Sequence, residues 1–121
     1  GGFSGGKYKN IIIGDEIERI ETGAFRDCNQ AEKIIIGKNV KKIGEHAFLN
    51  CLPKKIIMKS LTPPSFYRIF NNMELKTDPK NCFGERNPRL EIPYGCKDRY
   101  MENKYKEAFY EIVEIDLEPK L

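Results

Sequence analysis

The feature that most constrains the fold of this 121-residue chain is an internal repeat of 23 residues. When the chain is shifted by 23 positions, residues 11–33 fall on residues 34–56, and the identical residues that coincide are apolar or small. They are the Ile-Ile-Ile-Gly runs at 11–14 and 34–37, Ile20 with Ile43, Ala24 with Ala47, Phe25 with Phe48, and Cys28 with Cys51. A unit of this length with one short apolar strand cannot close a core alone, so stacked copies must bury each other's apolar edges. The repeat therefore predicts a solenoid.

Each unit is expected to begin with a strand and to end with a turn. The isoleucine runs at residues 11–13 and 34–36 are β-branched and are stopped by glycine, which is typical of short strands. We expect adjacent units to pair these strands in parallel, about 4.8 Å apart. The alanine and phenylalanine in the second half of each unit then supply a close approach and interior bulk. Ile12 should accordingly lie beside Ile35, and Phe25 beside Phe48.

Charged residues 23 positions apart should be lateral neighbours on adjacent units, where opposite charges are mildly favourable. The predicted opposite-charge pairs are Asp15 with Lys38, Glu18 with Lys41, and Glu32 with Lys55. Arg19 above Lys42 is the exception. We therefore interpret the lysine-rich segment 38–42 as part of a solvated charge ladder rather than as a phosphate-binding surface.

The second half of the chain, residues 61–121, is predicted to cover the open end of the solenoid, because an uncovered end exposes strand edges and apolar interior. Pro63 and Pro64 stiffen the exit from the repeats. Residues 65–89 are expected to form a long irregular crossover with turns at Asn71-Asn72, Asp78-Pro79 and Asn87-Pro88. Aromatic residues of this segment should pack onto the last unit, with a ligand-binding aromatic shelf as the alternative. They are Phe66, Tyr67, Phe70 and Phe83.

Three further elements are expected in the C-terminal part. Residues 90–93 should form a strand that joins the sheet, residues 97–108 an amphipathic helix, and residues 113–117 an edge strand. The apolar face of the helix is predicted to carry Met101, Tyr105, Ala108 and Phe109.

Residues 34–51 read I-I-I-G-K-N-V-K-K-I-G-E-H-A-F-L-N-C, and this string resembles the BspA-like leucine-rich repeats of bacterial surface proteins. The resemblance continues in the Pro-Pro of residues 63–64, the Ile-Pro of residues 92–93 and the Phe-x-x-Ile of residues 109–112. It implies an α/β fold: a leucine-rich-repeat solenoid with a short parallel sheet and a C-terminal helix-containing cap. Two positions depart from the family pattern. Gly14 and Gly37 stand where a proline follows the strand, and Ala31 and Lys54 stand where a leucine follows the cysteine.

We expect one domain over residues 1–121. Residues 1–10 would be an N-terminal remnant or cap, because residues 3–6 resemble the worn end of an earlier unit, out of register by one residue. Residues 11–60 would hold two 23-residue repeats and the start of a third, and residues 61–121 the C-terminal cap.

The residues that could carry chemistry do not predict an enzyme. Cys51 with His46, the single histidine, is the one pair close enough in sequence for nucleophilic catalysis, but Cys51 occupies a structural repeat position. One histidine and scattered cysteines lack the spacing of a metal site, and no cofactor motif occurs. Cys82 and Cys96 lie outside the repeats, and they could form a disulfide in an exported protein or remain free thiols.

The resemblance implies a non-enzymatic module of a surface or secreted bacterial protein, which makes protein–protein or host-matrix contacts. The binding candidates are Lys33, Ile35, Lys38 and Lys55, with Ile12 beside them on the sheet. Two to four strands would give a face about 15 Å wide, enough for a short peptide, so we expect a homo-oligomer or a piece of a longer array. The alternative is a structural cap or spacer with no ligand of its own.

Composition excludes some classes of partner. The net charge of +3 is too small to predict nucleic-acid binding. No apolar run approaches the ~20 residues of a membrane helix, and no signal peptide is visible at the start of the sequence.

Overall fold

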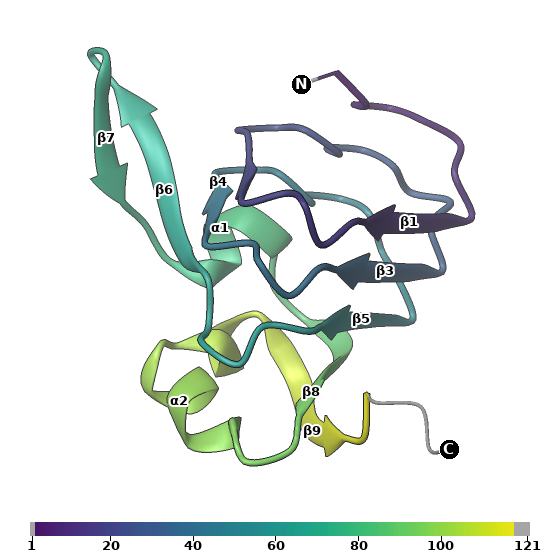
Figure 1. Cartoon of the computed structure of the whole chain (residues 1–121). Helices are drawn as coiled ribbons and strands as arrows, with labels where there is room; N and C mark the ends of the chain where they lie inside the picture. Colours follow the sequence, from purple (N-terminus) through teal and green to yellow (C-terminus); the bar gives the residue numbers. More distant parts are fainter. Residues whose placement is uncertain (1, 118–121) are drawn as a thin grey trace.

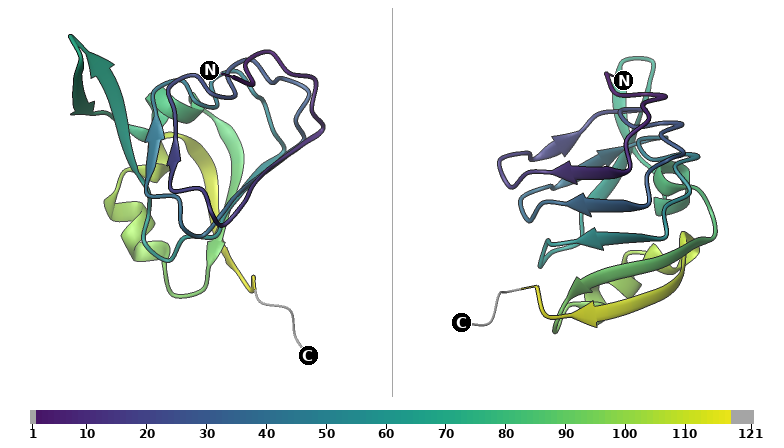
Figure 2. Two further views of the ribbon diagram at one scale, coloured as in Figure 1. Left: turned by 45° about the horizontal axis from the view of Figure 1, so that its top comes forward. Right: turned by 90° about the vertical axis from the view of Figure 1, so that its right-hand side faces the viewer.

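The fold is built around a five-stranded, wholly parallel sheet with strand order β1-β3-β5-β8-β9. The structure is a computed structural model, and it describes residues 2–117. The strands of this sheet are β1 (Asn10–Ile13), β3 (Lys33–Ile36), β5 (Lys55–Met58), β8 (Asn87–Pro93) and β9 (Phe109–Ile115). They stack one above the next with all five running the same way (Figures 1 and 2). The sheet is wider than the two to four strands expected from the sequence, because β8 and β9 of the C-terminal half continue it.

A second sheet of four strands forms where each unit turns back. Its order is β2-β4-β6-β7, with β2 (Arg19–Ile20), β4 (Lys42–Gly44), β6 (Ser65–Phe70) and β7 (Met73–Lys76). The first three strands are parallel, and β6 and β7 form an antiparallel hairpin. The helical elements are short: α1 (Pro79–Phe83), α2 (Lys97–Glu102) and the 3₁₀ helix η1 (Tyr105–Glu107). A mostly parallel arrangement with few helices is an α/β repeat fold.

The stacking predicted from the 23-residue shift is confirmed. Ile12 of β1 pairs with Ile35 of β3 in parallel register. The rings of Phe25 and Phe48 are stacked, with centroids 5.5 Å apart and planes 2° from parallel. Phe3 stacks on Phe25 at 5.1 Å and Phe83 on Phe48 at 5.5 Å. We call these four residues the phenylalanine column; its last member comes from α1, outside the sequence repeats.

Small side chains let adjacent units approach closely. A β-carbon added at Gly37 would lie 2.6 Å from the carbonyl oxygen of Gly14 in the preceding unit, and one at Gly44 would lie 2.5 Å from the backbone nitrogen of Thr22. The sequence departure from proline at position 37 therefore has a steric reason. The repeat cysteines cross the same interface, since Cys51 Sγ donates a hydrogen bond to the backbone oxygen of Phe25 at 3.1 Å.

The second unit, from β3 to β5, is one residue shorter than predicted, so one predicted charge pair is wrong. Lys33 pairs with Lys55, a spacing of 22 residues. Cys28 precedes Lys33 by five positions, whereas Cys51 precedes Lys55 by four. Glu32 therefore lies beside Lys54, whose N–H donates to the Glu32 backbone oxygen, and not beside Lys55.

The other charge pairs form in different ways. Lys41 and Glu18 make an exposed ion pair at 3.2 Å. The Asp15 carboxylate instead accepts the backbone N–H of Lys38 at 3.1 Å. Arg19 and Lys42 carry like charges, and a residue of β7 lies between them. The Glu74 carboxylate contacts both side chains at 2.5 Å, which reduces the repulsion between them.

The prediction of an irregular crossover over residues 65–89 is wrong. Most of the segment is the β6–β7 hairpin and α1, and the hairpin projects from the body as an arm (Figure 1). Asn71 and Asn72 do form its turn, with left-handed φ angles of 48° and 61° that suit a tight hairpin. Asn87-Pro88 is not a turn but the start of β8, where the buried Asn87 amide donates to the oxygen of Phe83 at 3.0 Å.

The aromatic prediction is confirmed for three residues and wrong for one. Phe66, Tyr67 and Phe83 are buried against the last unit. Phe70 is 53% exposed, because it lies on the arm beyond the part of β6 that pairs with β4.

The predicted helix over residues 97–108 is interrupted. α2 ends at Glu102, and Lys104 adopts a left-handed φ of 64° before η1 begins. Met101 is 40% exposed, so its assignment to the apolar face is wrong, because the break leaves it out of phase with Tyr105. Tyr100 is fully buried in its place, and its hydroxyl donates to the backbone oxygen of Ser60 at 2.6 Å. Tyr100 therefore fixes the C-terminal half to the end of the repeats, and Tyr105 donates to the backbone oxygen of Pro64 at 2.7 Å, within the C-terminal half.

Candidate functional site

The outward face of the five-stranded sheet carries a row of apolar side chains in register. Ile12, Ile35 and Ile57 are aligned across β1, β3 and β5. Side chains alternate along a strand, so their neighbours on either side point into the core. Ile12 is 70% exposed, while Ile35 and Ile57 are half-buried. We call these three residues the isoleucine row.

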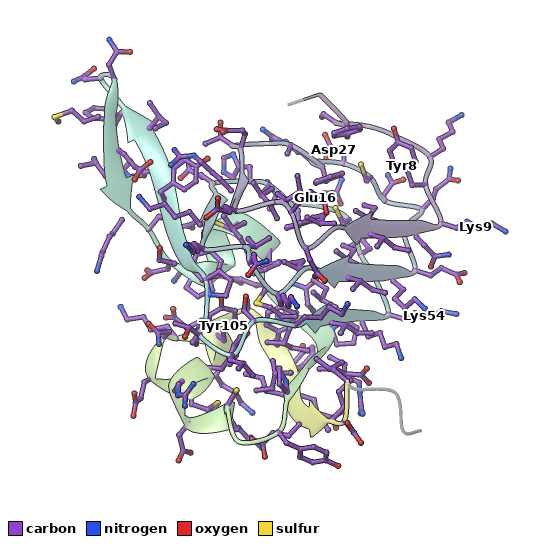
Figure 3. All side chains as sticks on the ribbon, viewed as in Figure 1. Tyr8, Lys9, Glu16, Asp27, Lys54 and Tyr105 are labelled. Atoms are coloured by element: carbon purple, nitrogen blue, oxygen red, sulfur yellow. The ribbon has the colours of Figure 1, made fainter. Side chains whose placement is uncertain are left out.

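Lysines gather where the strands of this face begin. Lys33 and Lys55 are aligned one pleat before the isoleucine row. Lys9 and Lys54 precede β1 and β5, and Figure 3 shows both pointing outward at the same edge of the sheet. We call these four lysines the lysine edge. Lys9, Lys33 and Lys54 have no ion-pair partner among residues 2–117, so three cations at this edge are uncompensated.

The isoleucine row ends at a buried carboxylate. Glu91 of β8 is aligned with Ile57 and is only 7% exposed. It is held between Lys55 at 3.5 Å and Arg89 at 2.8 Å, and Arg89 also contacts Glu111 of β9. Opposite charges therefore compensate one another at the β8–β9 end of the face, whereas the end at β1 and β3 is apolar with unpaired lysines beside it.

A cleft of about 1130 Å³ lies at the opposite edge, where the strands end. It opens because β5 and β8 pair over only two positions, Ile56 with Leu90 and Ile57 with Glu91, whereas β8 and β9 stay paired as far as Pro93. We call it the strand-end cleft. Its walls are formed by Asp15, residues 38–41, residues 59–63, Pro93, Tyr94 and residues 115–117.

The structure thus divides the four binding candidates between two places. Lys33, Ile35 and Lys55 lie together on the outward face, while Lys38 lines the strand-end cleft. Sequence reasoning did not identify Ile57, Lys9 and Lys54 on the first surface or Lys59, Leu61 and Tyr94 in the second. A 22-residue shift from Ile35 and Lys33 would have indicated Ile57 and Lys55 together. No sequence signal indicates the cleft.

The four cysteine side chains are part of the packed interior. All four cysteines are buried and free, so Cys82 and Cys96 do not form the disulfide that the sequence left open. The backbone of Cys82 makes the same kind of hydrogen bond as the repeats make with each other. The Cys82 oxygen accepts the N–H of Phe48, just as the Ala47 oxygen accepts the N–H of Phe25. Burial raises the pKa of Cys82 to about 12, with a further contribution from Glu45.

Cys51 and His46 do not form a nucleophile–base pair. The Cys51 thiol donates to the backbone oxygen of Phe25, and burial raises its pKa to about 12, which is opposite to the lowered pKa of a reactive thiol. His46 lies in the turn with a left-handed φ of 62°. Residues 2–117 contain no group of three or more side chains able to hold a metal ion. None of the helices formed by these residues is both long and apolar enough to traverse a bilayer.

Parallel strands recurring every 22 or 23 residues, with aligned phenylalanines inside and aligned isoleucines outside, define an α/β repeat protein. A family model described as a BspA-type leucine-rich-repeat region of six copies matches residues 1–87, most of the chain. The chain therefore belongs to the BspA-type leucine-rich-repeat family. Neither the curated proteins nor the solved structures contain a significant match.

Proposed function

We propose that this chain is a non-catalytic, protein-binding module of a bacterial surface or secreted protein, and that it binds its partner on the outward face of the five-stranded sheet. Family membership supports an interaction or adhesion role. The observation that carries the proposal is the isoleucine row, with Ile12 70% exposed beside unpaired lysines. Aligned aliphatic side chains with a charged border are typical of binding surfaces, because a soluble protein gains nothing from exposing them.

The geometry indicates the kind of partner. Five strands about 4.8 Å apart give a face about 19 Å wide, which suits an extended segment better than a large globular interface. Lys9, Lys33 and Lys54 favour acidic residues in that segment, and the isoleucine row favours aliphatic ones. A host-matrix protein with such a segment fits this description.

We further propose that the stacked units form part of a solenoid and that residues 61–121 cap it, within one domain. The supporting contacts are the hydrogen bond of Tyr100 with Ser60 and the pairing of β8 with β5. A cap or spacer with no ligand is the second candidate function, and these same contacts favour it.

Selection of random ten-residue peptides displayed on phage, with the purified chain immobilised, tests the binding role. We expect enriched peptides to alternate aliphatic and acidic residues, and to bind the Ile12→Asp and Lys33→Glu variants at least 10-fold more weakly. Lys76→Glu, on the exposed arm, is the matched charge reversal and should bind as the wild type does. If no peptide is enriched, or if the wild type and the three variants bind equally well, the binding role is contradicted and the cap or spacer role remains.

A further inference from the structure

The strand-end cleft has the shape of a site for an extended chain. Its lining comes from the ends of all five parallel strands in succession: Asp15 after β1, residues 38–41 after β3, residues 59–63 after β5, Pro93 and Tyr94 at β8, and residues 115–117 at β9. Neighbouring strands lie about 4.8 Å apart, so the cleft follows the stack for about 19 Å. An extended peptide rises about 3.3 Å per residue, so about six residues would lie along it.

The lysines of the cleft are available to a ligand. Lys38 and Lys59 have no ion-pair partner within residues 2–117, and Lys41 makes only the exposed pair with Glu18. The carboxylate of Asp15 is occupied by the backbone N–H of Lys38. Lys38 and Lys59 follow adjacent strands, so two ammonium groups would face neighbouring carboxylates of one ligand.

Large apolar side chains are exposed at the same place. Leu61 is 62% exposed and Tyr94 is 67% exposed. Ile115 and Leu117 are half-buried beside them. A ligand that carries carboxylates alone would leave this apolar surface in water, so the lining fits a ligand with both acidic and apolar side chains.

The walls of the cleft are fixed before any ligand arrives. The Ser60 hydroxyl donates to the backbone oxygen of Lys38 at 2.9 Å, which ties the second unit to the third. Arg99 of α2 donates to the backbone oxygen of Leu61 at 3.0 Å, and Tyr100 donates to that of Ser60. A preformed wall lowers the entropy lost on binding, because the loop is already ordered.

We propose that the strand-end cleft is a second peptide-binding site, and that it binds an extended segment of a partner protein in which acidic residues alternate with leucine or an aromatic residue. The proposal rests on the proposed protein-binding function but uses a surface that the isoleucine row does not share. The acidic side chains pair with Lys38 and Lys59, and the apolar ones lie against Leu61 and Tyr94.

The test is a fluorescence-anisotropy titration of the intact chain with the labelled peptide acetyl-Gly-Glu-Leu-Asp-Tyr-Glu-Gly-amide. A second peptide carries glutamine and asparagine in place of the three acids, and both peptides have blocked ends. We expect the acidic peptide to bind at least 10-fold more tightly than the amide peptide. Lys38→Gln/Lys59→Gln should weaken its binding at least 10-fold, and Tyr94→Ala about 3- to 10-fold. The matched control, Lys76→Gln/Lys80→Gln, removes two lysines from β7 and α1 and should change nothing.

Two outcomes overturn the inference: equal binding of the two peptides, or unchanged binding by Lys38→Gln/Lys59→Gln. If Ile12→Asp loses binding while Lys38→Gln/Lys59→Gln retains it, the peptide binds on the outward face. That result would contradict the cleft proposal and would support the proposed function. Amide chemical-shift changes on peptide addition give an independent readout that needs no variant. They should fall on residues 38–41, 59–62 and 94–95, and changes confined to β1 and β3 would contradict the proposal.

Discussion

At the scale of single residues, the closest approach between units depends on side chains that are missing or small. Gly37 lies so near the carbonyl oxygen of Gly14 that no β-carbon fits without a backbone shift. The repeat cysteines occupy the same interface and donate hydrogen bonds to the preceding unit, as Cys28 does to the oxygen of Phe3 and Cys51 to that of Phe25. Glycine and cysteine therefore permit the close contact between adjacent units at this interface.

Substitution of Gly37 by alanine tests this spacing. We expect Gly37→Ala to lower the free energy of unfolding by about 2 kcal/mol, because backbone atoms of the preceding unit must move. Urea denaturation followed by circular dichroism measures the change. Gly2→Ala is the control, since a β-carbon at Gly2 meets nothing within 4 Å, and it should change stability by less than about 0.5 kcal/mol. Equal effects of the two substitutions would contradict the steric explanation.

The buried thiols predict an alkaline loss of stability. Burial raises the folded-state pKa of Cys51 from 9.0 to about 12, so the folded state retains a proton that the unfolded state releases above pH 9. The stabilisation from this group is complete below pH 9 and is lost as pH rises from 9 towards 12, at about 1.4 kcal/mol per pH unit. Cys51→Ala should reduce the slope of unfolding free energy against pH by that amount between pH 9.5 and 10.5, measured by urea titration. The slope between pH 6 and 8 should be the same in both proteins.

At the scale of the elements, ion pairs hold the β6–β7 arm to the repeats. Glu74 of β7 joins Arg19 of β2 to Lys42 of β4, and the Arg19 guanidinium lies 4.1 Å from the centre of the Tyr67 ring. Hydrogen bonds from Lys42 and then Arg19 lower the pKa of Glu74. The arm therefore places one carboxylate between two like charges that the repeat brings side by side, which reduces their repulsion.

Glu74→Gln should loosen the arm without unfolding the molecule. We expect faster amide exchange in residues 67–76 at pH 7 and little change in global stability, because exposed ion pairs contribute weakly. In the wild type, the contribution of Glu74 should be present above its ordinary pKa and lost as pH falls through its lowered folded-state value. Glu16→Gln, an exposed carboxylate with no ion pair among residues 2–117, should leave exchange in the arm unchanged. Acceleration spread evenly over the whole chain would contradict a local role.

The sequence predicted the repeated elements and failed where an element has no repeated partner. β1 and β3 were predictable because their isoleucines recur at a fixed shift. The arm was not, because β7 pairs only with β6 and its side chains do not alternate between buried and exposed. The half-exposed Met101 shows the same limit, since a left-handed residue at Lys104 broke the helical period that placed it inside.

Part of the outward face was predictable from the sequence, whereas the strand-end cleft was not. Lys33, Ile35 and Lys55 follow from strand alternation, so part of the outward face is predictable from the sequence. The strand-end cleft depends on the separation of β5 from β8 after Glu91, and that separation is a property of two strands 34 residues apart in the chain. No local pattern in the sequence encodes it.

At the scale of the whole molecule, the phenylalanine column connects the repeats to the C-terminal half. Phe48 is 1% exposed and contacts Phe25 on one side and Phe83 on the other. Phe83 in turn contacts Phe66 and Phe109, so one aromatic cluster joins the units to β6, α1 and β9.

Truncation of Phe48 should therefore destabilise the entire fold. We expect Phe48→Ala to cost about 3–5 kcal/mol in unfolding free energy, as for other buried aromatic residues. Phe70→Ala on the arm removes the same atoms from a side chain that is 53% exposed, and should cost less than about 1 kcal/mol. Urea denaturation of both variants measures the two losses. If Phe48→Ala does not fold, the milder variant Phe48→Leu takes its place, because it should retain a measurable unfolding transition. Similar losses for Phe48→Ala and Phe70→Ala would contradict the importance of the column.

The insertion of the arm between β5 and β8 has a consequence for how such chains can vary. Residues that pair between β3 and β5 are 22 positions apart, as Ile34 and Ile56 are, whereas Ile56 and Leu90 are 34 apart. Loop-closure entropy grows only with the logarithm of loop length, so the longer excursion disfavours folding by only about 0.4 kcal/mol relative to an ordinary unit. The polypeptide between these two strands could therefore lengthen or shorten considerably across relatives while the stack beneath it kept its geometry.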